Sequence, residues 1–501
     1  MLHAVPDLTA VDAAVLHAID EIRHGLRHAL SRPRRWNGTL RRQAQARSVR
    51  GSNSIEGIIV SDDQALAIVG SESDQVSVDA TWLAVKGSSD AMTFLQVLAD
   101  RQRTLSEEDL LALHFMVQSY DLDRGPGRYR RGEVFVHDDD SGRRVYTGPE
   151  ADAVPGLMGE YLAALAELAA GDVHPMVQGA MAHLNLVMIH PFSDGNGRMS
   201  RIVQSYMLYR EQVAEAQFVS IEEYLGRNTS AYYDILARTG RGRWSPERSA
   251  AEWVEFALTA HYRQARTVQG RLWSADRVAE QVDDLVGAGL APERATPALE
   301  LTFSGWGLRN ATYRELAEVT ATTASRDLSA LVDADILQRH GAKKGAWYSP
   351  AEVYRTWLTE LREQTKTSFD AGADPYRLAS RGRRSLSALR QCDRRAPHRR
   401  RQVLRSAQPT NWTAKPSSAI AKPPKRTPMT RRRAAGSSSS ATPRRSMSPA
   451  ATSAVPGIGG TSANPSIASV TVSSRPKAIR LNTGRRPGRG GPVNSSRSPG
   501  L

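Results

Sequence analysis

Apolar residues recur at helical spacing along most of the first 370 residues. Between Val11 and Leu30 they fall three and four positions apart, which predicts an amphipathic helix. The same spacing predicts further helices over residues 41–56, 82–98, 197–207, 232–239 and 250–266. A stripe from Val177 to Met188 must end at or before His190, because Pro191 follows and disfavours helical backbone before it. The pattern therefore predicts a mainly α fold.

One stretch of this helical pattern is interrupted by β-prone residues. Val134–Val136 and Arg144–Thr147 are short apolar and β-branched runs, and turn residues lie before and between them. They predict a single β-hairpin whose strand edge could align a target segment. Upstream, Ser106 is followed by three acidic residues and predicts the N-cap of a helix that runs through Leu113.

From Trp273 onward the order of elements changes. The sequence predicts a short helix over 313–319, a second over 324–332, and two short strands between Ile336 and Tyr348. This order resembles a winged helix-turn-helix module. Its basic residues could meet DNA phosphates, namely Arg326, Arg339, Lys343 and Lys344. Acidic residues interleave with them, namely Asp327, Asp333 and Asp335, so DNA binding and protein docking both stay open.

The formal net charge of +15 is concentrated in the last part of the chain. Residues 371–501 hold 27 Lys and Arg but 2 Asp and Glu, whereas residues 1–370 hold 40 and 50. The basic tail lacks apolar periodicity, which predicts disorder, although an Arg/Pro/Ser run can also arise from a frame error. The expected organisation is an N-terminal region (1–105), a helical core (106–266), the winged-helix module (267–370) and the tail (371–501).

Cysteine usage and the N-terminus bear on the cellular compartment. The single cysteine, Cys392, excludes an intrachain disulfide or a Cys-based zinc site. Met1–Ala10 lacks the basic and apolar regions of a signal peptide, and no stretch has the length of a membrane span. We therefore expect a cytoplasmic protein without membrane partners.

The segment His190-Pro-Phe-Ser-Asp-Gly-Asn-Gly-Arg-Met-Ser-Arg201 concentrates groups with chemical potential. Backbone N–H groups of Gly195–Gly197, at the start of the next helix, would converge on an anion. Arg198 and Arg201 are three apart and can lie on one side of that helix. Asp194 is a suitable Mg²⁺ ligand, and His190, with an ordinary pKa of about 6.5, can accept a proton. The segment predicts transfer from a nucleotide, although a turn between two helices would also use these glycines.

Together these residues resemble the signature of the Fic family, H-P-F-x-[D/E]-G-N-[G/K]-R-x-x-R, at every fixed position. The resemblance extends over roughly 106–261. Other segments in family order are Arg124–Arg130, Val145–Pro149, His174, His183 and Tyr232-Tyr233. It implies a Fic helical core with a β-hairpin flap near the active centre.

The resemblance also implies roles for individual residues. His190 would be the general base, Asp194 the Mg²⁺ ligand and Arg201 the partner of the γ-phosphate of ATP. The phosphate binders would be Gly195, Asn196, Gly197 and Arg198, and Tyr232 or Tyr233 would line the adenine site. Gly197, where kinase-like relatives carry Lys, implies AMP transfer to a hydroxyl of a target protein. An ATP-sensing, DNA-binding regulator is the alternative.

Ser52-Asn-Ser-Ile-Glu-Gly57 resembles the inhibitory motif of many Fic proteins. Ser52 and Glu56 are four apart and would share a helix face, from which Glu56 would pair with Arg201 and block the γ-phosphate site. The resemblance thus implies autoinhibition, and it leaves open a bifunctional enzyme that also removes AMP. An ordinary helix cap is the simpler alternative. A homodimer is a further expectation that the sequence does not decide.

Overall fold

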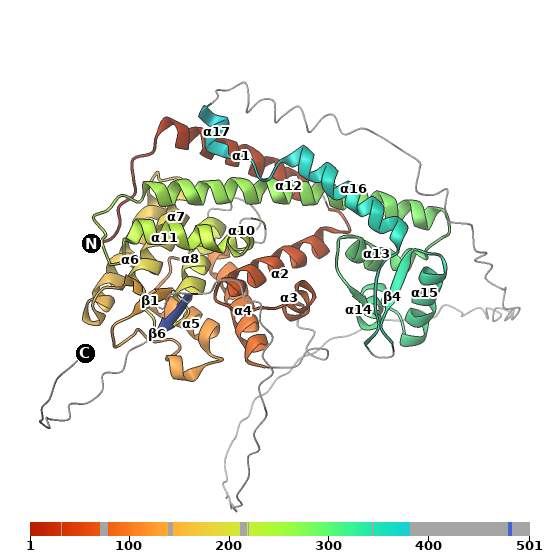
Figure 1. Cartoon of the computed structure of the whole chain (residues 1–501), viewed down its shortest axis with the longest axis horizontal. Helices are drawn as coiled ribbons and strands as arrows, with labels where there is room; N and C mark the ends of the chain where they lie inside the picture. The colour runs from red at the N-terminus through yellow and green to blue at the C-terminus, as the bar shows by residue number, and fades with distance from the viewer. Residues whose placement is uncertain are drawn as a thin grey trace, which may run out of the picture. The chain divides into compact units, whose positions relative to one another are not determined.

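The computed structural model describes residues 1–31, 33–70, 79–138, 144–210, 218, 220–342, 345–380 and 479–482. Helices dominate this part of the chain, and strands form two small sheets, as the apolar spacing predicts (Figure 1). No helix within these residues combines the length and the apolar character needed to cross a membrane.

Four helices precede the helical core. They are α1 (Ala10–Ser31), α2 (Asn37–Ile55), α3 (Asp62–Val69) and α4 (Ala80–Asp100). Helix α3 begins with a capping box between Ser61 and Gln64, and the Asp79 carboxylate caps α4 by accepting from the backbone N–H of Trp82. Helix α2 contains the first four residues of the segment that resembles the inhibitory motif. It ends at Ile55, and Glu56 follows directly.

The helical core surrounds a continuous apolar cluster. Its helices are α5 (Glu107–Gln118), α6 (Val154–Ala170), α7 (Pro175–Ile189), α8 (Asn196–Arg210), α10 (Glu222–Arg227) and α11 (Thr229–Gly240). Ser106 caps α5 in a capping box with Asp109, as the sequence predicts. Helices α7 and α8 pack together, and fully buried apolar residues such as Leu184 and Val203 fill the core. The loop between α7 and α8 therefore has a rigid foundation.

The predicted hairpin consists of β1 (Phe135–Asp138) and β2 (Arg144–Thr147), paired antiparallel with Phe135 opposite Thr147. Its turn, 139–143, lies outside the described residues. A third strand, β6 (Ile479–Asn482), pairs antiparallel with the other edge of β1. The edge that we expected to be open is therefore occupied, since unpaired backbone groups on a strand edge readily pair with another extended segment.

Helix α12 (Ala251–Gly287) crosses the domain boundary expected between residues 266 and 267. Apolar residues remain buried at helical spacing beyond that point, for example Val268, Leu272 and Val282. No proline interrupts the segment, so the helix continues. The expected boundary therefore falls within one continuous helix, which packs against both the core and the following module.

The C-terminal module contains α13 (Thr296–Phe303), β3 (Leu308–Arg309), α14 (Asn310–Ala317), α15 (Ala321–Asp333), β4 (Leu337–His340), β5 (Trp347–Pro350) and α16 (Glu352–Phe369). The strand order is β3-β5-β4, all antiparallel. Two short helices and two strands follow in the predicted order, and the identity of a winged helix-turn-helix module stays a prediction. Three 3₁₀ helices complete the described elements, at Leu122–Arg124, Ala151–Ala153 and Glu293–Ala295.

The charged residues considered for DNA binding occupy different environments. Arg326 and Arg339 are exposed, whereas Lys343 and Lys344 lie outside the described residues. Asp327 is fully buried, where it pairs with Arg294 through two contacts of 2.6 and 2.7 Å and accepts from the Tyr313 hydroxyl at 2.9 Å. Asp327 therefore stabilises the module internally and does not interleave with surface cations.

Helix α17 (Pro375–Ser380) lies within the segment expected to be a disordered tail. The Tyr376 hydroxyl donates to Asp12 Oδ1 at 2.7 Å and so ties α17 to α1. Residues 375–380 thus form a helix within the expected tail, because one aromatic residue anchors an otherwise polar segment. The rest of the predicted tail, 381–478 and 483–501, lies outside the described residues.

Candidate active site

His190 ends helix α7 in left-handed backbone geometry (φ 53°), and its side chain is 5% exposed. Its Nδ1 lies 3.0 Å from the carbonyl oxygen of Val187, an acceptor, so Nδ1 carries the proton. Nε2 is buried and has no partner among the described residues. Burial lowers the pKa of His190 to about 4. The imidazole is therefore neutral near pH 7 and offers a lone pair at Nε2.

The loop after His190 is closed by its own polar groups. The Asn196 side chain accepts from the backbone N–H of Phe192 and donates to its carbonyl, both at 2.9 Å. Gly195 adopts a positive φ of 78°, and the Arg130 guanidinium donates to the carbonyl of His190 at 2.8 Å. The amide of Asn196 thus holds the loop together, and phosphate binding at this residue stays a prediction. Its backbone N–H at the start of α8 remains suited to an anion.

Asp194 occupies the centre of this loop and is partly exposed. Its Oδ1 accepts from the backbone N–H of Gly195 at 2.7 Å, and Gln118 Nε2 lies 3.4 Å from Oδ2. Arg124 Nε is 3.9 Å away. The described residues contain no cluster of three or more metal-binding side chains. Mg²⁺ bound to a nucleotide commonly uses one or two carboxylates plus phosphate oxygens and water, so Asp194 alone fits that ion.

Two residues of α5 support the loop and were not singled out from the sequence. His114 Nε2 donates to the carbonyl of Asp194 at 3.0 Å, Nδ1 accepts from Gly127 N–H at 2.9 Å, and the ring stacks on Phe192 with centroids 3.7 Å apart. Burial lowers the pKa of His114 to about 4, which keeps it neutral. Gln118 contacts Asp194 as described above. His114 and Gln118 are four apart on one helix, a spacing that would have indicated a shared polar face.

Arg198 and Arg201 are both buried but face different neighbours. Arg198 donates from Nη2 to Gln118 Oε1 at 2.6 Å and from Nη1 to the carbonyl of Val117 at 3.2 Å, so it contacts α5. Arg201 instead contacts α2, as described below. The expected placement of both guanidinium groups on one side of α8 is therefore only approximate. Among the described residues, Arg198 Nε and Arg201 Nη1 have no hydrogen-bond partner.

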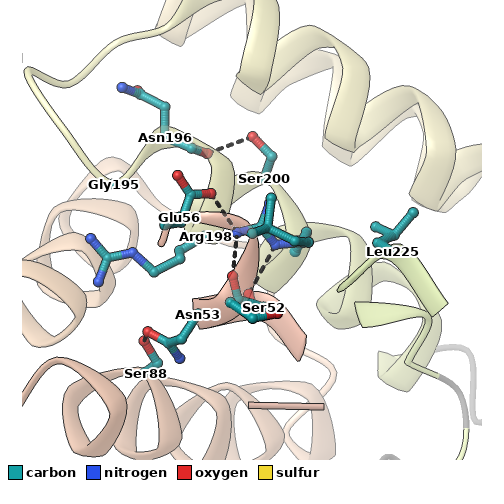
Figure 2. A network of polar contacts seen from close by, with 12 residues as sticks. Ser52, Asn53, Glu56, Ser88, Gly195, Asn196, Arg198, Ser200 and Leu225 are labelled. Atoms are coloured by element: carbon teal, nitrogen blue, oxygen red, sulfur yellow. Dashed lines mark hydrogen bonds and ion pairs between the residues drawn. The ribbon is translucent and has the colours of Figure 1, made fainter. Parts of the chain in front are cut away.

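The contacts of Arg201 join the loop to the segment that resembles the inhibitory motif. Arg201 donates from Nε to Ser52 Oγ at 2.9 Å, and from Nη2 to the Ser52 carbonyl at 3.0 Å and to Glu56 Oε1 at 2.7 Å. Figure 2 shows Ser52 and Glu56 on the same side of the helix end. A Cβ on Gly197 would lie 2.3 Å from Glu56 Oε1, so Gly197 makes room for this carboxylate. The expected pairing of Glu56 with Arg201 is present, through one nitrogen rather than two.

The two tyrosines expected at the adenine site differ in position. Tyr232 is 1% exposed, and its hydroxyl lies 2.9 Å from His183 Nε2 within the core. The Tyr232 side chain thus lies within the core, and a role of either tyrosine at the adenine site stays a prediction. Tyr233 is partly exposed and donates to the carbonyl of Ile55 at 3.0 Å, which fixes the end of α2 beside the loop.

Helix α2 also packs unusually closely on α10. A Cβ on Gly51 would lie 2.5 Å from the carbonyl oxygen of Glu222, so only glycine fits there. The Glu222 carboxylate accepts from Ser205 at 2.8 Å and from Ser48 at 3.2 Å, which links α10 to α8 and α2. Burial raises the pKa of Glu222. Helix α2 is thus attached to the core through small and polar residues.

The helical core, the hairpin and the buried loop between α7 and α8 are the features of a Fic-type helical domain. Comparison with known proteins agrees, because residues 104–208 match the model of the Fic/DOC family. Over these residues the chain is similar to the Fic/DOC family.

Named relatives share this domain. The "Protein adenylyltransferase Fic" of Drosophila melanogaster is 28% identical over 286 residues, which cover 55% of this chain and 53% of the relative. The protein of the same name from Drosophila yakuba is 31% identical over 209 residues, 40% of each chain. The chain spans about half the length of the curated relatives it matches. A Fic family protein of Desulfovibrio desulfuricans of known structure has 22% identity and a TM-score of 0.46, covering 70% of this chain and 98% of that one.

Proposed function

We propose that this protein transfers AMP from ATP to a hydroxyl side chain of a target protein. The observation that carries the proposal is the buried, neutral His190, whose Nε2 has no partner among the described residues and which opens an anion-binding loop. A neutral imidazole with an unused acceptor is what a general base requires. The names of the relatives, each a protein adenylyltransferase, support the same activity.

In this proposal each polar group of the loop has a separate task. His190 Nε2 takes the proton of the attacking hydroxyl, while the Val187 carbonyl stabilises the imidazolium through Nδ1. Backbone N–H groups at Gly195–Gly197 and the Arg198 guanidinium bind phosphate oxygens. Asp194 would hold Mg²⁺, which neutralises charge on the phosphates when bound. Arg201 would bind the γ-phosphate and align the α-phosphate with the hydroxyl.

The docked α2 then represents an autoinhibited state. Glu56 accepts a hydrogen bond from the Arg201 guanidinium that would bind the γ-phosphate. Ser52 accepts two further hydrogen bonds from Arg201, one at its hydroxyl and one at its carbonyl. Both partners are largely removed from solvent, with side-chain exposures of 1% for Arg201 and 19% for Glu56, so the pair is stronger than a surface ion pair. ATP would have to displace this contact before its phosphates align.

The hairpin is the surface that would align the target. Main-chain pairing with β1 would place an extended target segment near the loop, but β6 already pairs with that edge. A target strand would therefore have to replace residues 479–482. Because this recognition uses backbone groups, it leaves the identity of the target unspecified.

The proposal is tested by the intact mass of the full chain, and of its Glu56→Gly variant, after incubation with Mg-ATP. Addition of one AMP group, strongest in the variant, would support AMP transfer and self-modification together. Addition of a phosphate group alone would indicate kinase-like transfer instead. If both proteins stay unmodified and no added protein becomes labelled, the transferase proposal fails and the ATP-sensing alternative gains support. Loss of the label on longer incubation, dependent on Glu56, would favour the bifunctional alternative.

A further inference from the structure

A cavity of about 500 Å³ separates helices α2, α12 and α16, away from the loop of His190. This volume is in the range of small-molecule sites in proteins. Its walls include Gln43 and Arg47 of α2, Arg271 of α12 and Arg362 of α16. The cavity therefore lies against the helix that carries the inhibitory contacts.

The lining of this cavity is strongly cationic. Six of its residues are basic and one, Asp370, is acidic, the basic ones being Arg47, Arg227, Arg266, Arg271, Arg362 and Lys366. The nearby Glu223 pairs with Arg271 at 2.6 Å and with Arg227 at 2.7 Å. Asp62 also acts on Arg47 and Arg271, and Glu363 lies 3.9 Å from Lys366. Four carboxylates against six cations still leave an excess of positive charge, which attracts anions into a concave site.

Two residues of α2 place polar groups on the wall of the cavity, and one of these groups has no partner among the described residues. Gln43 is 2% exposed, lines the cavity, and has an Nε2 without a hydrogen-bond partner among the described residues. A buried donor left in this way destabilises the protein unless a ligand or water accepts from it. Arg47 lies over the ring of Trp306 at 5.1 Å, and burial together with the nearby Arg271 lowers its pKa to about 9. Both groups would be stabilised by an anion.

The remaining wall is apolar and would contact a non-polar body. Val278, Phe303 and Leu358 line the cavity and are all buried. The cavity thus has cations and an unpaired donor on one side and apolar side chains on the other. Such a cavity suits a ligand that has an anionic group at one end and a non-polar group at the other. We propose that this cavity binds a small organic phosphate, with the phosphate at Gln43, Arg47 and Arg362 and the organic part against the apolar wall.

The position of α2 gives the site a regulatory consequence, which rests on the autoinhibition proposed above. Gln43 and Arg47 of α2 form one wall of the cavity, so undocking of α2 would remove that wall. A ligand that binds the docked state more tightly shifts the population towards it. Occupancy would therefore reinforce the contact of Glu56 with Arg201 and lower AMP transfer.

Binding is tested by calorimetry of the full chain with two probes, inorganic pyrophosphate and uridine diphosphate. The double variant Arg362→Glu/Lys366→Glu changes two exposed cavity residues and should lower the affinity for uridine diphosphate at least about tenfold. Arg355→Glu is the control for a charge reversal on α16 outside the cavity, and it carries half of the charge change of the double variant. Arg198→Gln reports binding at the active loop and should leave the affinity within about twofold.

Each outcome decides a part of the inference. If Arg198→Gln abolishes binding and the double variant retains it, the probe occupies the active loop and the cavity proposal is wrong. Equal affinities for the two probes would overturn the organic part of the assignment, because the apolar wall should favour uridine diphosphate. Unsaturable binding would leave a surface counter-ion effect and overturn the whole proposal. None of these outcomes depends on AMP transfer, so failure here is distinguishable from failure of the proposed function.

Gln43→Leu gives an independent test that does not rely on surface charges. Leucine is similar in size and removes the unpaired donor, so the melting temperature without ligand should stay equal or rise. The affinity for uridine diphosphate should fall several-fold at the same time. A lower melting temperature together with unchanged affinity would show that Gln43 is only a packing residue and would contradict the proposed contact.

Discussion

The active loop and the docked helix α2 both bury polar residues, yet they are held in different ways. The loop is fixed from within, by the Asn196 side chain on Phe192 and by His114 and Arg130 on its carbonyl groups. It rests on the fully buried Phe192. Helix α2 is fixed from outside, since more than half of its buried residues are polar or glycine. Its attachment depends on what α8, α10 and α12 present to it.

This difference has an energetic meaning. Small and polar residues bury little apolar area, so α2 gains less from burial than a core helix such as α7 does. Gly51, Ser52, Asn53 and Ser54 also have low helix propensity, which leaves the end of α2 dependent on docking. The loop should therefore keep its geometry when α2 leaves, and α2 should be removable without unfolding the core.

The largest expected effect separates chemistry from binding within the loop. His190→Ala should lower AMP transfer at least roughly a hundredfold, because it removes the proton acceptor of the attacking hydroxyl. ATP affinity, measured by calorimetry, should change by no more than a few-fold, since the imidazole makes no necessary phosphate contact. A variant that keeps its activity would remove His190 from the mechanism.

A second prediction addresses the contact between the two regions. Glu56→Gly should raise transfer about tenfold or more, because it frees Arg201 for the γ-phosphate and weakens the end of α2. Glu56→Gln keeps the helix and removes the charge, so it should activate in part. Self-labelling with AMP is the readout, and Glu56→Gly/His190→Ala should be silent. Unchanged labelling in both single variants would contradict autoinhibition and would show that residues 52–57 are an ordinary helix end.

A third prediction concerns the packing of α2 on α10 and leaves Arg201 unchanged. Gly51→Ala places a Cβ 2.5 Å from a backbone oxygen of Glu222, so α2 must shift, at a cost of about 1–3 kcal/mol. Transfer should rise several-fold while the core stays folded. Gly38→Ala is the matched control on the same helix, because its Cβ would meet nothing within 4 Å. If the two variants behave equally in labelling and melting experiments, the proposed close packing of Gly51 on Glu222 is contradicted.

The acid limb of the pH profile tests the state of His190. Burial lowers its pKa to about 4, and a base must be deprotonated, so kcat/KM should persist below pH 6.5 and fall only as pH approaches 4. Circular dichroism at each pH separates loss of activity from acid unfolding. A half-maximal rate near pH 6.5 with intact fold would show that the imidazole is solvated in the working enzyme.

Sequence patterns predicted most of the helices and the components of the site, for identifiable reasons. Apolar spacing marks elements such as α1 and α7 because their burial is one-sided or complete, and the turn after His190 follows from Pro191. The pairing of Glu56 with Arg201 was expected only through resemblance to a family. Spacing alone did not separate Arg198 from Arg201, since their partners come from distant α5 and α2.

Other features depended on tertiary packing that no local pattern contains. The continuation of α12 past residue 266 is the exception, because apolar residues such as Val268 and Leu272 continue there at helical spacing. Tyr232 and Asn196 have polar side chains of the kind found in binding sites. In the structure the Tyr232 hydroxyl contacts His183 in the core, and the Asn196 amide bonds to the backbone of Phe192. Gly51 looks like a poor helix residue until the approach of Glu222 is known. Each of the other cases is decided by a partner more than twenty residues away or by the loop's own closure.

The smallest expected effect concerns helix α17 and its contact with α1. Truncation after Ser380 should leave both stability and AMP transfer unchanged, because α17 and its contact with α1 are retained. Truncation after Asp370 removes the hydrogen bond from Tyr376 to Asp12 and the one from Arg263 to the carbonyl of Ala373, which are 2.7 and 3.1 Å long. Hydrogen bonds of this kind contribute about 1 kcal/mol each, so the shorter protein should unfold at lower denaturant concentration while its transfer rate stays within about twofold. A protein ending at residue 380 that is as destabilised as the one ending at 370 would show that residues beyond 380, such as β6, contribute to the fold.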